Sequence, residues 1–282
     1  MNSRIRELRT RFFFGPLMGA LVVLIFWLDR TRTGGHVAAT AFGLLALAGV
    51  HEYVTMFRKA GFAVHGGLLG LATLGLCVSA FFFGWHSIDH ELYPLTIGTL
   101  ALLFPLTLRS LRQEYMARGL EEQGATLLGF TWIAWPLFFA QGMALRHVGS
   151  VLFVLIVCKG GDTLAYLSGV TFGRRKLIPH ISPGKTIEGA VGGMLGSVLL
   201  ALLFAPLVLL PEIDLSLTGT IGAGIMLNVT TQTGDLVESL LKRRCGAKDS
   251  STLLPAHGGV LDLVDSLLFS FPAWFLVLVR LT

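Results

Sequence analysis

Carboxylates and cations alternate near the end of the sequence in a pattern that suits phosphate chemistry. The residues concerned are Asp235, Lys242, Arg243, Lys248, Asp249, Asp262 and Asp265. Mg²⁺ is commonly held by one or two carboxylates, with substrate phosphates completing its shell, and Lys or Arg neutralises phosphate oxygens. A metal alone would not need so many cations, and an anion alone would not need so many carboxylates. The pattern therefore predicts a metal-assisted phosphate site.

A second basic segment stands immediately before an apolar run. It contains Ser182, Lys185 and Thr186, and the intervening Pro183-Gly184 predicts a turn. If a helix begins after Thr186, its free N–H groups would lie beside a Lys and two hydroxyls, which favours phosphate binding by these residues. The spaced glycines of a P-loop are missing. A simple basic loop at the membrane surface is the alternative.

Asp162 lies inside an apolar run, where an ionisable side chain is costly and indicates a function. It shares a helix face with Tyr166, Gly169 and Gly173, and the glycines would allow a close approach of another backbone or a ligand. We expect Asp162 to take part in substrate binding. Pairing with Lys159, three residues earlier, is the structural alternative.

A polar stripe runs along one face of the helix expected over residues 218–240. Its members are Asn228, Thr231, Gln232, Asp235, Glu238, Ser239 and Lys242, which fall within about 120° of the helix circumference. Such a stripe must face protein or a water-filled cavity. We expect it to line the site, with inert packing as the alternative. By contrast, His51 and Glu52 in the first half are expected to be an interfacial pair.

The composition predicts which elements position these residues. The chain has 282 residues, of which 53% are hydrophobic and only 14% charged, against about 25% charged in soluble domains. Its mean hydropathy is +0.71. We therefore expect an all-α polytopic integral membrane protein with about nine transmembrane helices. The expected spans are residues 12–28, 36–57, 67–85, 93–108, 126–145, 149–171, 187–210, 218–240 and 260–281.

Two regions follow from this pattern. Residues 1–145 would form the N-terminal transmembrane helices and residues 146–282 the C-terminal catalytic region. A cleaved signal peptide over residues 1–28 is the alternative to a retained first span. Cys77, Cys158 and Cys245 have neither disulfide nor zinc-site spacing, so we expect all three to be structural.

Lys and Arg gather in alternate loops, which predicts the orientation. If the N-terminus is cytoplasmic, the loops near residues 58, 109, 174 and 242 share the cytoplasmic side and carry most of these residues. The C-terminus would then face outward and the phosphate site the cytoplasm. The net charge of +5 would suit nucleic acid, but basic residues confined to short loops between apolar runs exclude that class.

The segment from Ser239 to Asp265 reads S-L-L-K-R-R-C-G-A-K-D-S-S-T-L-L-P-A-H-G-G-V-L-D-L-V-D. It resembles the signature of the phosphatidate cytidylyltransferase (CDP-diacylglycerol synthase) family, S-x-x-K-R, then K-D, then H-G-G-x-x-D-R-x-D. Residues 161–166 (G-D-T-L-A-Y) and 182–189 (S-P-G-K-T-I-E-G) are similar to further motifs of that family. The resemblance covers about residues 150–282. One position departs, because Leu263 stands where the family usually has Arg.

The resemblance implies the reaction CTP + phosphatidate → CDP-diacylglycerol + pyrophosphate, with Mg²⁺ and with a second metal or a monovalent cation left open. It implies a bacterial inner-membrane enzyme whose active site faces the cytoplasm, as a monomer or a homodimer. The implied catalytic residues are Asp235, Lys248, Asp249, Asp262 and Asp265, with Asp235 and Asp262 as the principal metal ligands. The implied substrate-binding residues are Asp162, Ser182, Lys185, Thr186, Lys242, Arg243 and His257, although His257 could instead only hold the Gly-Gly turn.

Two other functions stay open. A related enzyme could use another lipid phosphate or nucleotide, as a lipid kinase does. A transporter could also hold carboxylates within its spans, but it would spread them near the midplane and over both halves of the chain. Here they cluster in one half.

Overall fold

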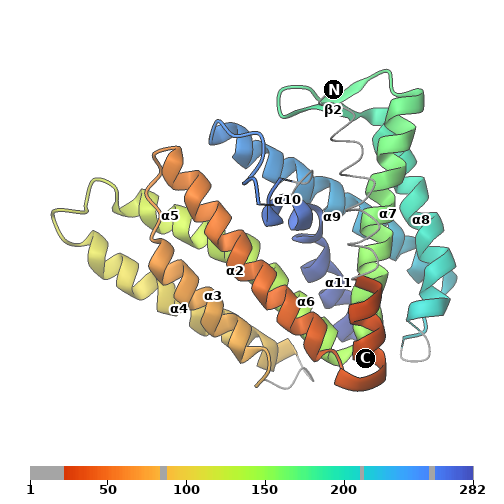
Figure 1. The fold of residues 1–282 in the computed structure, drawn as a ribbon, viewed down its shortest axis with the longest axis horizontal. Coiled ribbons are helices and arrows are strands. Elements are labelled where there is room, and N and C mark those ends of the chain that lie inside the picture. Colours follow the sequence, from red (N-terminus) through yellow and green to blue (C-terminus); the bar gives the residue numbers. More distant parts are fainter. Residues whose placement is uncertain (1–21, 83–87, 210–212, 254–257, 282) are drawn as a thin grey trace. The chain divides into compact units, whose positions relative to one another are not determined.

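The computed structural model describes residues 22–82, 88–209, 213–253 and 258–281 (Figure 1). Its α-helices are α2 (His36–Lys59), α3 (Gly66–Ser79), α4 (Ile88–Ser110), α5 (Gly119–Gly129), α6 (Trp135–Arg146), α7 (Val148–Phe172), α8 (Ile187–Val208), α9 (Leu217–Arg244), α10 (Val260–Val264) and α11 (Ser270–Leu281). Two π-helical turns, Asp29–Thr33 and Phe130–Ala134, and one 3₁₀ turn, η3 (Asp265–Leu267), accompany them. The strands β1 (Lys176–Ile178) and β2 (Ser182–Thr186) complete the chain.

The protein is a polytopic helical membrane protein. Six helical stretches in the described ranges are long and apolar enough to cross a bilayer: His36–Lys59, Leu92–Ser110, Gly119–Arg146, Val148–Phe172, Ile187–Val208 and Val260–Leu281. Two further predicted spans differ from this set. The run at 67–85 is the shorter helix α3, and the run at 218–240 is α9, whose polar stripe lowers its hydropathy. The predicted first span lies mostly outside the described residues.

The chain divides into two compact units. The first comprises residues up to Val148 together with Cys245–Leu263, and the second comprises Gly149–Arg244 with Val264–Thr282. The segment Cys245–Leu263 lies in the first unit. The division into N-terminal helices (residues 1–145) and a catalytic region (residues 146–282) stays a prediction.

In the first unit, α2 packs along α3 and α6. Buried polar groups fix these contacts: the Gln141 amide donates to the carbonyl of Ala39 (3.0 Å), and the Tyr53 hydroxyl donates to the carbonyl of Ala125 (2.7 Å). Asp29 stabilises the first turn of α2 by accepting hydrogen bonds from the N–H groups of Val37 (2.9 Å) and Ala38 (2.7 Å). Such a cap satisfies amides that the first turn leaves without partners.

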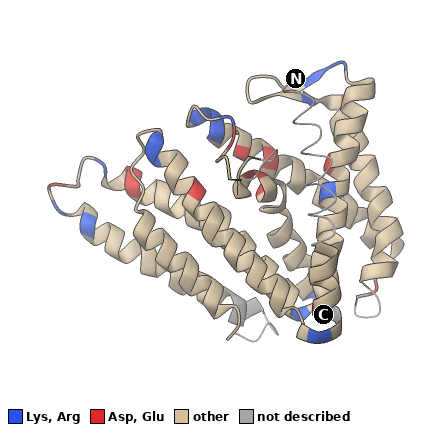
Figure 2. Cartoon of the chain, in the orientation of Figure 1, with Lys and Arg blue, Asp and Glu red and all other residues tan. Residues whose placement is uncertain are grey.

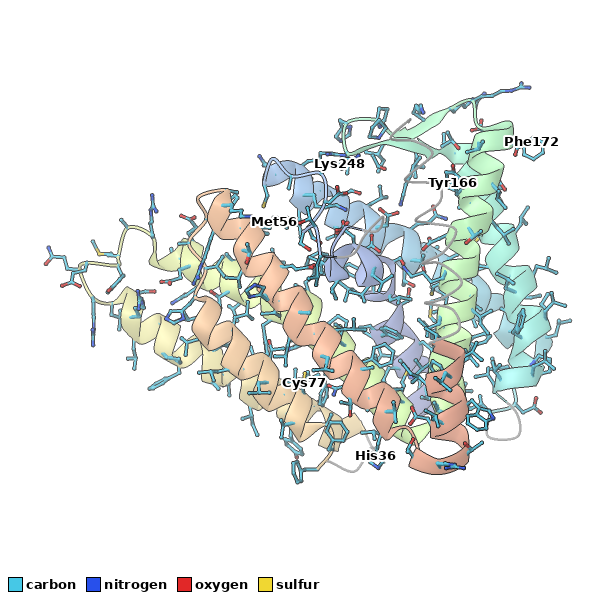
Figure 3. The ribbon with its side chains drawn as sticks, viewed as in Figure 1. His36, Met56, Cys77, Tyr166, Phe172 and Lys248 are labelled. Carbon is cyan, nitrogen blue, oxygen red and sulfur yellow. The ribbon has the colours of Figure 1, made fainter. Side chains whose placement is uncertain are left out.

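In the second unit, α8 packs closely on both α7 and α9. A Cβ on Gly189 would lie 2.8 Å from the carbonyl oxygen of Ala165 and 3.1 Å from the Cα of Gly169, so these glycines bring the backbones of α7 and α8 together. The glycines of α7 thus serve helix packing. Tyr166, predicted to share their face, is 70% exposed and points away from the helix, as Figure 3 shows.

The basic segment between α7 and α8 is an antiparallel hairpin, with Lys176 opposite Thr186 and Ile178 opposite Ser182. The predicted turn at Pro183-Gly184 is wrong: both residues lie within β2, and the chain reverses at residues 179–181. Pro183 fits there because an edge strand of a two-stranded hairpin can spare a backbone donor. Thr186 caps α8 by accepting a hydrogen bond from the N–H of Gly189 (3.1 Å), and its role in phosphate binding stays a prediction.

Candidate active site

A cluster of charged side chains lies inside the second unit. Its members are Lys159 and Asp162 of α7, Lys185 of β2, Asp235 of α9 and Asp265 of η3. The charges of the three carboxylates act on one another, and Lys159 and Lys185 offset them. Figure 2 shows how few charged residues the helices carry elsewhere along their length. Four of these five residues are among the predicted site residues, and Lys159 is the addition.

Lys185 and Asp235 are joined directly. The Nζ of Lys185 lies 2.8 Å from Oδ2 of Asp235, and the Ser239 hydroxyl, one turn further along α9, donates to the other carboxylate oxygen at 3.3 Å. Both partners of the ion pair are partly accessible, at 23% and 33% of their side chains. The pair links the hairpin to α9 and leaves both groups within reach of a ligand.

Lys159 contacts η3, the turn that carries Asp265. Its ammonium donates to the Ser266 hydroxyl (2.7 Å) and lies 3.9 Å from Oδ1 of Asp265. The predicted continuous span at 260–281 is broken there into α10, the 3₁₀ turn η3 and α11. Gly234 permits this arrangement, because any side chain on it would collide with the backbone of Asp265. Non-helical backbone at membrane depth is tolerated where protein covers it.

The polar stripe of α9 divides into two parts. Asn228 donates to the Ser197 hydroxyl (3.0 Å), and Gln232 donates to the carbonyl of Ala190 (3.2 Å), so both hold α9 against α8. Thr231 shares a hydrogen bond with Ser270 of α11 (3.1 Å). This part of the stripe is therefore structural packing, and only the end at Asp235 and Ser239 joins the charged cluster.

Two predicted phosphate-binding cations have protein partners. Lys242 forms an ion pair with Glu238, one turn earlier on α9, and Glu238 is fully buried. The Nε of Arg243 donates to the carbonyl of Ile181 at 3.4 Å, which ties the turn of the hairpin to the end of α9. Both contacts position elements of the second unit, and a role in phosphate binding stays a prediction.

In the first unit, Asp262 accepts hydrogen bonds from other residues of the signature segment. Oδ2 of Asp262 accepts hydrogen bonds from the N–H of Ser250 (2.8 Å), the hydroxyl of Ser250 (2.7 Å) and the N–H of Gly259 (2.8 Å). The last of these is the reciprocal bond of a capping box, in which the third helical residue reaches back to the N-cap. Asp262 thus fixes the turn before α10, and its role as a metal ligand stays a prediction.

The two glycines of His257-Gly258-Gly259 have separate reasons to be glycine. Gly258 has a φ of +86°, which L side chains rarely adopt, and any Cβ on Gly259 would collide with Ser250 and Glu52. His257 itself lies outside the described residues. Lys248 and Asp249 are exposed on the same segment, where Figure 3 labels Lys248.

Glu52 is a buried carboxylate whose long-range contacts the sequence interpretation missed. It is only 4% exposed and accepts hydrogen bonds from Ser250, Ser251, Val260 and Leu261. The expected interfacial pair with His51 is therefore wrong for Glu52. The signal was available, since a carboxylate inside an apolar run indicates a function for Glu52 as it does for Asp162.

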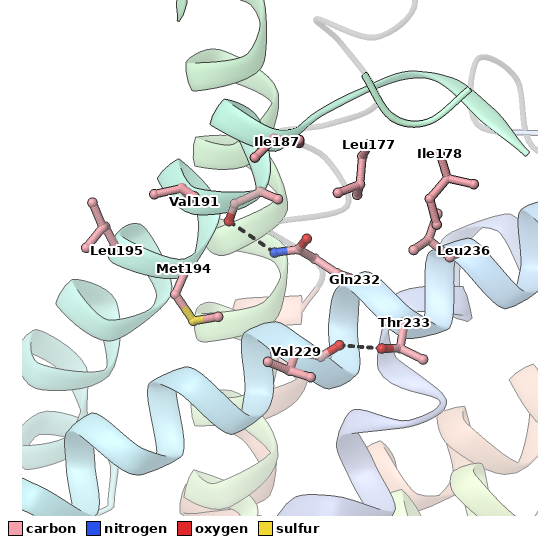
Figure 4. A pocket seen from close by; sticks show the side chains of 11 residues that line it. Leu177, Ile178, Ile187, Val191, Met194, Leu195, Val229, Gln232, Thr233 and Leu236 are labelled. Atoms are coloured by element: carbon pink, nitrogen blue, oxygen red, sulfur yellow. Dashed lines mark hydrogen bonds between the residues drawn. The ribbon is translucent and has the colours of Figure 1, made fainter. Parts of the chain in front are cut away.

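An apolar groove of about 420 Å³ opens in the second unit beside the charged cluster (Figure 4). Its walls come from the hairpin, α8 and α9, and are formed by Leu177, Ile178, Ile187, Ala190, Val191, Met194, Leu195, Val229, Gln232, Thr233 and Leu236. Asp235 directly precedes Leu236, and Lys185 lies two residues before Ile187. The backbone positions of the ion pair therefore border the groove, although neither side chain lines it.

A family comparison decides the class of protein. Residues 9–281 match the model of the cytidylyltransferase family. The chain belongs to that family. This cytidylyltransferase is accordingly a CTP-dependent nucleotidyltransferase and an enzyme.

Curated relatives agree with this membership. The chain is 32% identical over 264 residues to the phosphatidate cytidylyltransferase of Staphylococcus haemolyticus, covering 93% of this chain and 97% of that protein. It is 30% identical, with the same coverage, to the phosphatidate cytidylyltransferase of Staphylococcus saprophyticus. An uncharacterized Escherichia coli protein, YnbB, is 40% identical over 154 residues, which is 53% of this chain and about half (49%) of YnbB.

The carboxylates of the cytidylyltransferase would fit Mg²⁺ as part of a coordination shell that substrate phosphates and water complete. Among the described residues, no three His, Cys, Asp or Glu side chains are arranged to hold a metal ion by themselves. Mg²⁺ rarely needs such a cage, because it keeps several waters and binds through one or two carboxylates plus substrate phosphates. Asp235 and Asp265 provide hard oxygen donors of that kind, and lysines for the phosphates lie beside them.

Proposed function

We propose that this chain is a phosphatidate cytidylyltransferase that transfers the cytidylyl group of CTP to phosphatidate, with Mg²⁺, at the cytoplasmic face of the membrane. The observation that carries the proposal is the Lys185–Asp235 pair at the margin of an apolar groove, in a chain of the cytidylyltransferase family. An amphiphilic phosphate substrate needs this combination of cation, carboxylate and apolar surface.

The reaction is an exchange of one phosphorus–oxygen bond for another. A phosphate oxygen of phosphatidate forms a bond to the α-phosphorus of CTP while the bond from that phosphorus to the bridging oxygen breaks, and pyrophosphate leaves with the bonding pair. A phosphomonoester is mostly ionised at neutral pH, because its second pKa is about 6. The nucleophile therefore needs no general base, and we assign none.

The side chains of the cluster have the task of holding two anions together. Lys185 would leave Asp235 for a phosphate oxygen, and Lys159 keeps Asp265 and Ser266 in place on the broken span. Asp235, with Asp265 beside it, would hold Mg²⁺. When bound, Mg²⁺ neutralises phosphate charge and favours in-line transfer.

The groove would take an acyl chain of the lipid substrate. Its lining is apolar except for Gln232 and Thr233, whose polar groups already bond to backbone carbonyls at Ala190 and Val229. Because the acyl chain comes from a bilayer that is equally apolar, van der Waals packing against the walls would favour binding, not transfer from water. The phosphate of a lipid lying in the groove would then reach the ion pair at its margin.

The direct test is a cytidylyl-transfer assay on the purified protein with labelled CTP, phosphatidate and Mg²⁺. We expect the wild type to form CDP-diacylglycerol and pyrophosphate, and Asp235→Asn to lose about 100-fold or more in kcat. Asp214→Asn is the matched control, because Asp214 is an exposed carboxylate outside the cluster. A wild type that forms no CDP-lipid would refute the function. An Asp235→Asn variant as active as Asp214→Asn would refute the role of the cluster.

A further inference from the structure

Each carboxylate oxygen of Glu52, on α2, lies within hydrogen-bonding distance of one hydroxyl and one amide. Oε1 accepts from the hydroxyl of Ser251 (2.6 Å) and the N–H of Val260 (2.9 Å). Oε2 accepts from the N–H of Leu261 (2.9 Å) and lies 3.0 Å from the hydroxyl of Ser250, whose single proton can go to Glu52 or to Asp262. The buried carboxylate thus has three donors of its own and shares a fourth with Asp262, and hydrogen bonds to a charged acceptor are strong.

These donors come from both ends of one short segment. Ser250 and Ser251 follow Asp249, and Val260 and Leu261 are the first two residues of α10. The carboxylate therefore clamps the beginning of the segment to its end. Burial strengthens the clamp, because an unpaired donor in this interior would lose its water without compensation.

The same segment carries predicted catalytic groups. The Ser250 hydroxyl lies within hydrogen-bonding distance of both Glu52 (3.0 Å) and Asp262 (2.7 Å), so it couples the clamp to that carboxylate. Asp262 in turn accepts the N–H of Gly259. A displacement of Glu52 would thus reach Asp249 through its neighbour Ser250, and Asp262 through the Ser250 hydroxyl.

We infer that Glu52 is a positioning residue of the cytidylyltransferase, which acts through Ser250, Ser251 and the first amides of α10 to hold Asp249 and Asp262 in their working geometry. The inference rests on the proposed function for the meaning of that geometry. It assigns a role in the reaction to a residue of the N-terminal helices, which the signature motif does not include.

Glu52→Gln is the primary variant, because it keeps the shape of the side chain and places an NH₂ group against donors. Asp29→Asn is a closely matched control: Asp29 is 2% exposed, accepts two amides at the start of α2, and has no hydrogen bond to the residues of the segment that the structure describes. Both changes should lower thermal stability to a similar degree. We expect kcat of the folded protein to fall about 10- to 100-fold in Glu52→Gln, the range for supporting residues around a site, and to stay within twofold of wild type in Asp29→Asn.

Two further measurements separate positioning from simple stability. Glu52→Asp keeps the charge on a shorter side chain and should recover part of the lost kcat. In a double-mutant cycle, Ser251→Ala should cost less activity in the Glu52→Gln background than in the wild type, because the two residues share one bond. Equal kcat in Glu52→Gln and Asp29→Asn, or fully additive effects in the cycle, would overturn the inference.

Hydrogen exchange gives a readout that does not depend on the reaction. In Glu52→Gln, the amides of Val260 and Leu261 should exchange at least tenfold faster than in the wild type, while those of Val37 and Ala38 stay unchanged; Asp29→Asn should give the reverse. Unchanged protection at Val260 and Leu261 would overturn the clamp itself. If the clamp is confirmed but the wild type forms no CDP-lipid, the proposed function fails and the role of Glu52 in it is refuted, while the structural clamp stands.

Discussion

Lys185 and Asp235 form an ion pair in which either side chain could exchange its partner for a ligand. Each is partly accessible and each is the other's partner across 2.8 Å. A partly exposed ion pair contributes little to stability, so the pair is better explained by readiness to bind a phosphate and a cation than by holding β2 to α9. The hydrogen bonds of Arg243 and Thr186 already anchor the hairpin and the start of α8.

Lys185→Gln tests that reading. We expect kcat/KM for CTP to fall about 10- to 100-fold, since a hydrogen bond to a charged group is worth about 1.5–3 kcal/mol, while the melting temperature changes little. Lys185→Arg keeps the positive charge and should retain more activity than Lys185→Gln. Steady-state kinetics and thermal unfolding in detergent provide the measurements. A large loss of stability without loss of affinity for CTP would contradict the role in phosphate binding.

Residues of the charged cluster could be predicted where the sequence itself shows a polar or charged side chain within a largely apolar helix. Asp162 stands out because an apolar run makes a carboxylate expensive, and Asp235 stands out as a member of the polar stripe of α9. Glu52 met the same criterion and was missed, because its donors at residues 250–261 are far away in the sequence. Lys159 was weighed only as a partner of Asp162, whereas its hydrogen bond goes to Ser266. Long-range pairing of this kind depends on tertiary packing, which periodicity does not encode.

At the scale of elements, helices bounded by clear signals were predicted well. The expected runs at 149–171 and 187–210 correspond to Val148–Phe172 and Ile187–Val208, since Thr186 and the glycines mark where each can begin or end. The hairpin was not predicted, because residues 173–186 lack the alternating pattern of a strand and Pro183-Gly184 normally indicates a turn. The break at Asp265–Leu267 was not predicted for a different reason: residues 260–271 contain no Gly or Pro to mark it, and Gly234 on α9 decides the path.

The groove between the hairpin, α8 and α9 gives a prediction at this scale. Leu195 lines the groove, whereas Leu199, one turn further along α8, lies outside it, and both are largely exposed, at 68% and 55%. Leu195→Trp should raise KM for long-chain phosphatidate about three- to tenfold and leave KM for CTP unchanged, because it fills space meant for an acyl chain. Leu199→Trp makes the same substitution on the same helix and should change neither constant. Equal effects of the two variants would show that the groove does not bind the acyl chain.

At the scale of the whole molecule, the distribution of Lys and Arg predicts which loops face the cytoplasm. The loop at Arg175 would lie inside and the loop at Asp214 outside, and both residues are exposed. The three native cysteines should interfere little. Cys77 and Cys158 are buried, and burial raises the pKa of Cys245 above that of a free thiol. A higher pKa leaves less of the reactive thiolate at neutral pH, so labelling of Cys245 should be slow at pH 7 and accelerate as the pH rises.

In intact cells at pH 7, a membrane-impermeant maleimide should therefore label Asp214→Cys and spare Arg175→Cys. After the membrane is opened with detergent, both variants should react. The reverse pattern would place the hairpin and its ion pair on the outer side, away from cytoplasmic CTP, and would contradict the proposed orientation.

The polar stripe of α9 has a consequence for how the protein is made. A helix of 28 residues is long enough to cross the bilayer, yet its Asp, Glu, Asn and Gln residues make its transfer from the translocon into lipid unfavourable by itself. The amides that bond to Ser197 and Ala190 of α8 become acceptable in hydrocarbon only after that helix is present. Because α8 is synthesised before α9, it can already be in the membrane when α9 emerges. We expect α9 to leave the translocon packed against α8 rather than alone.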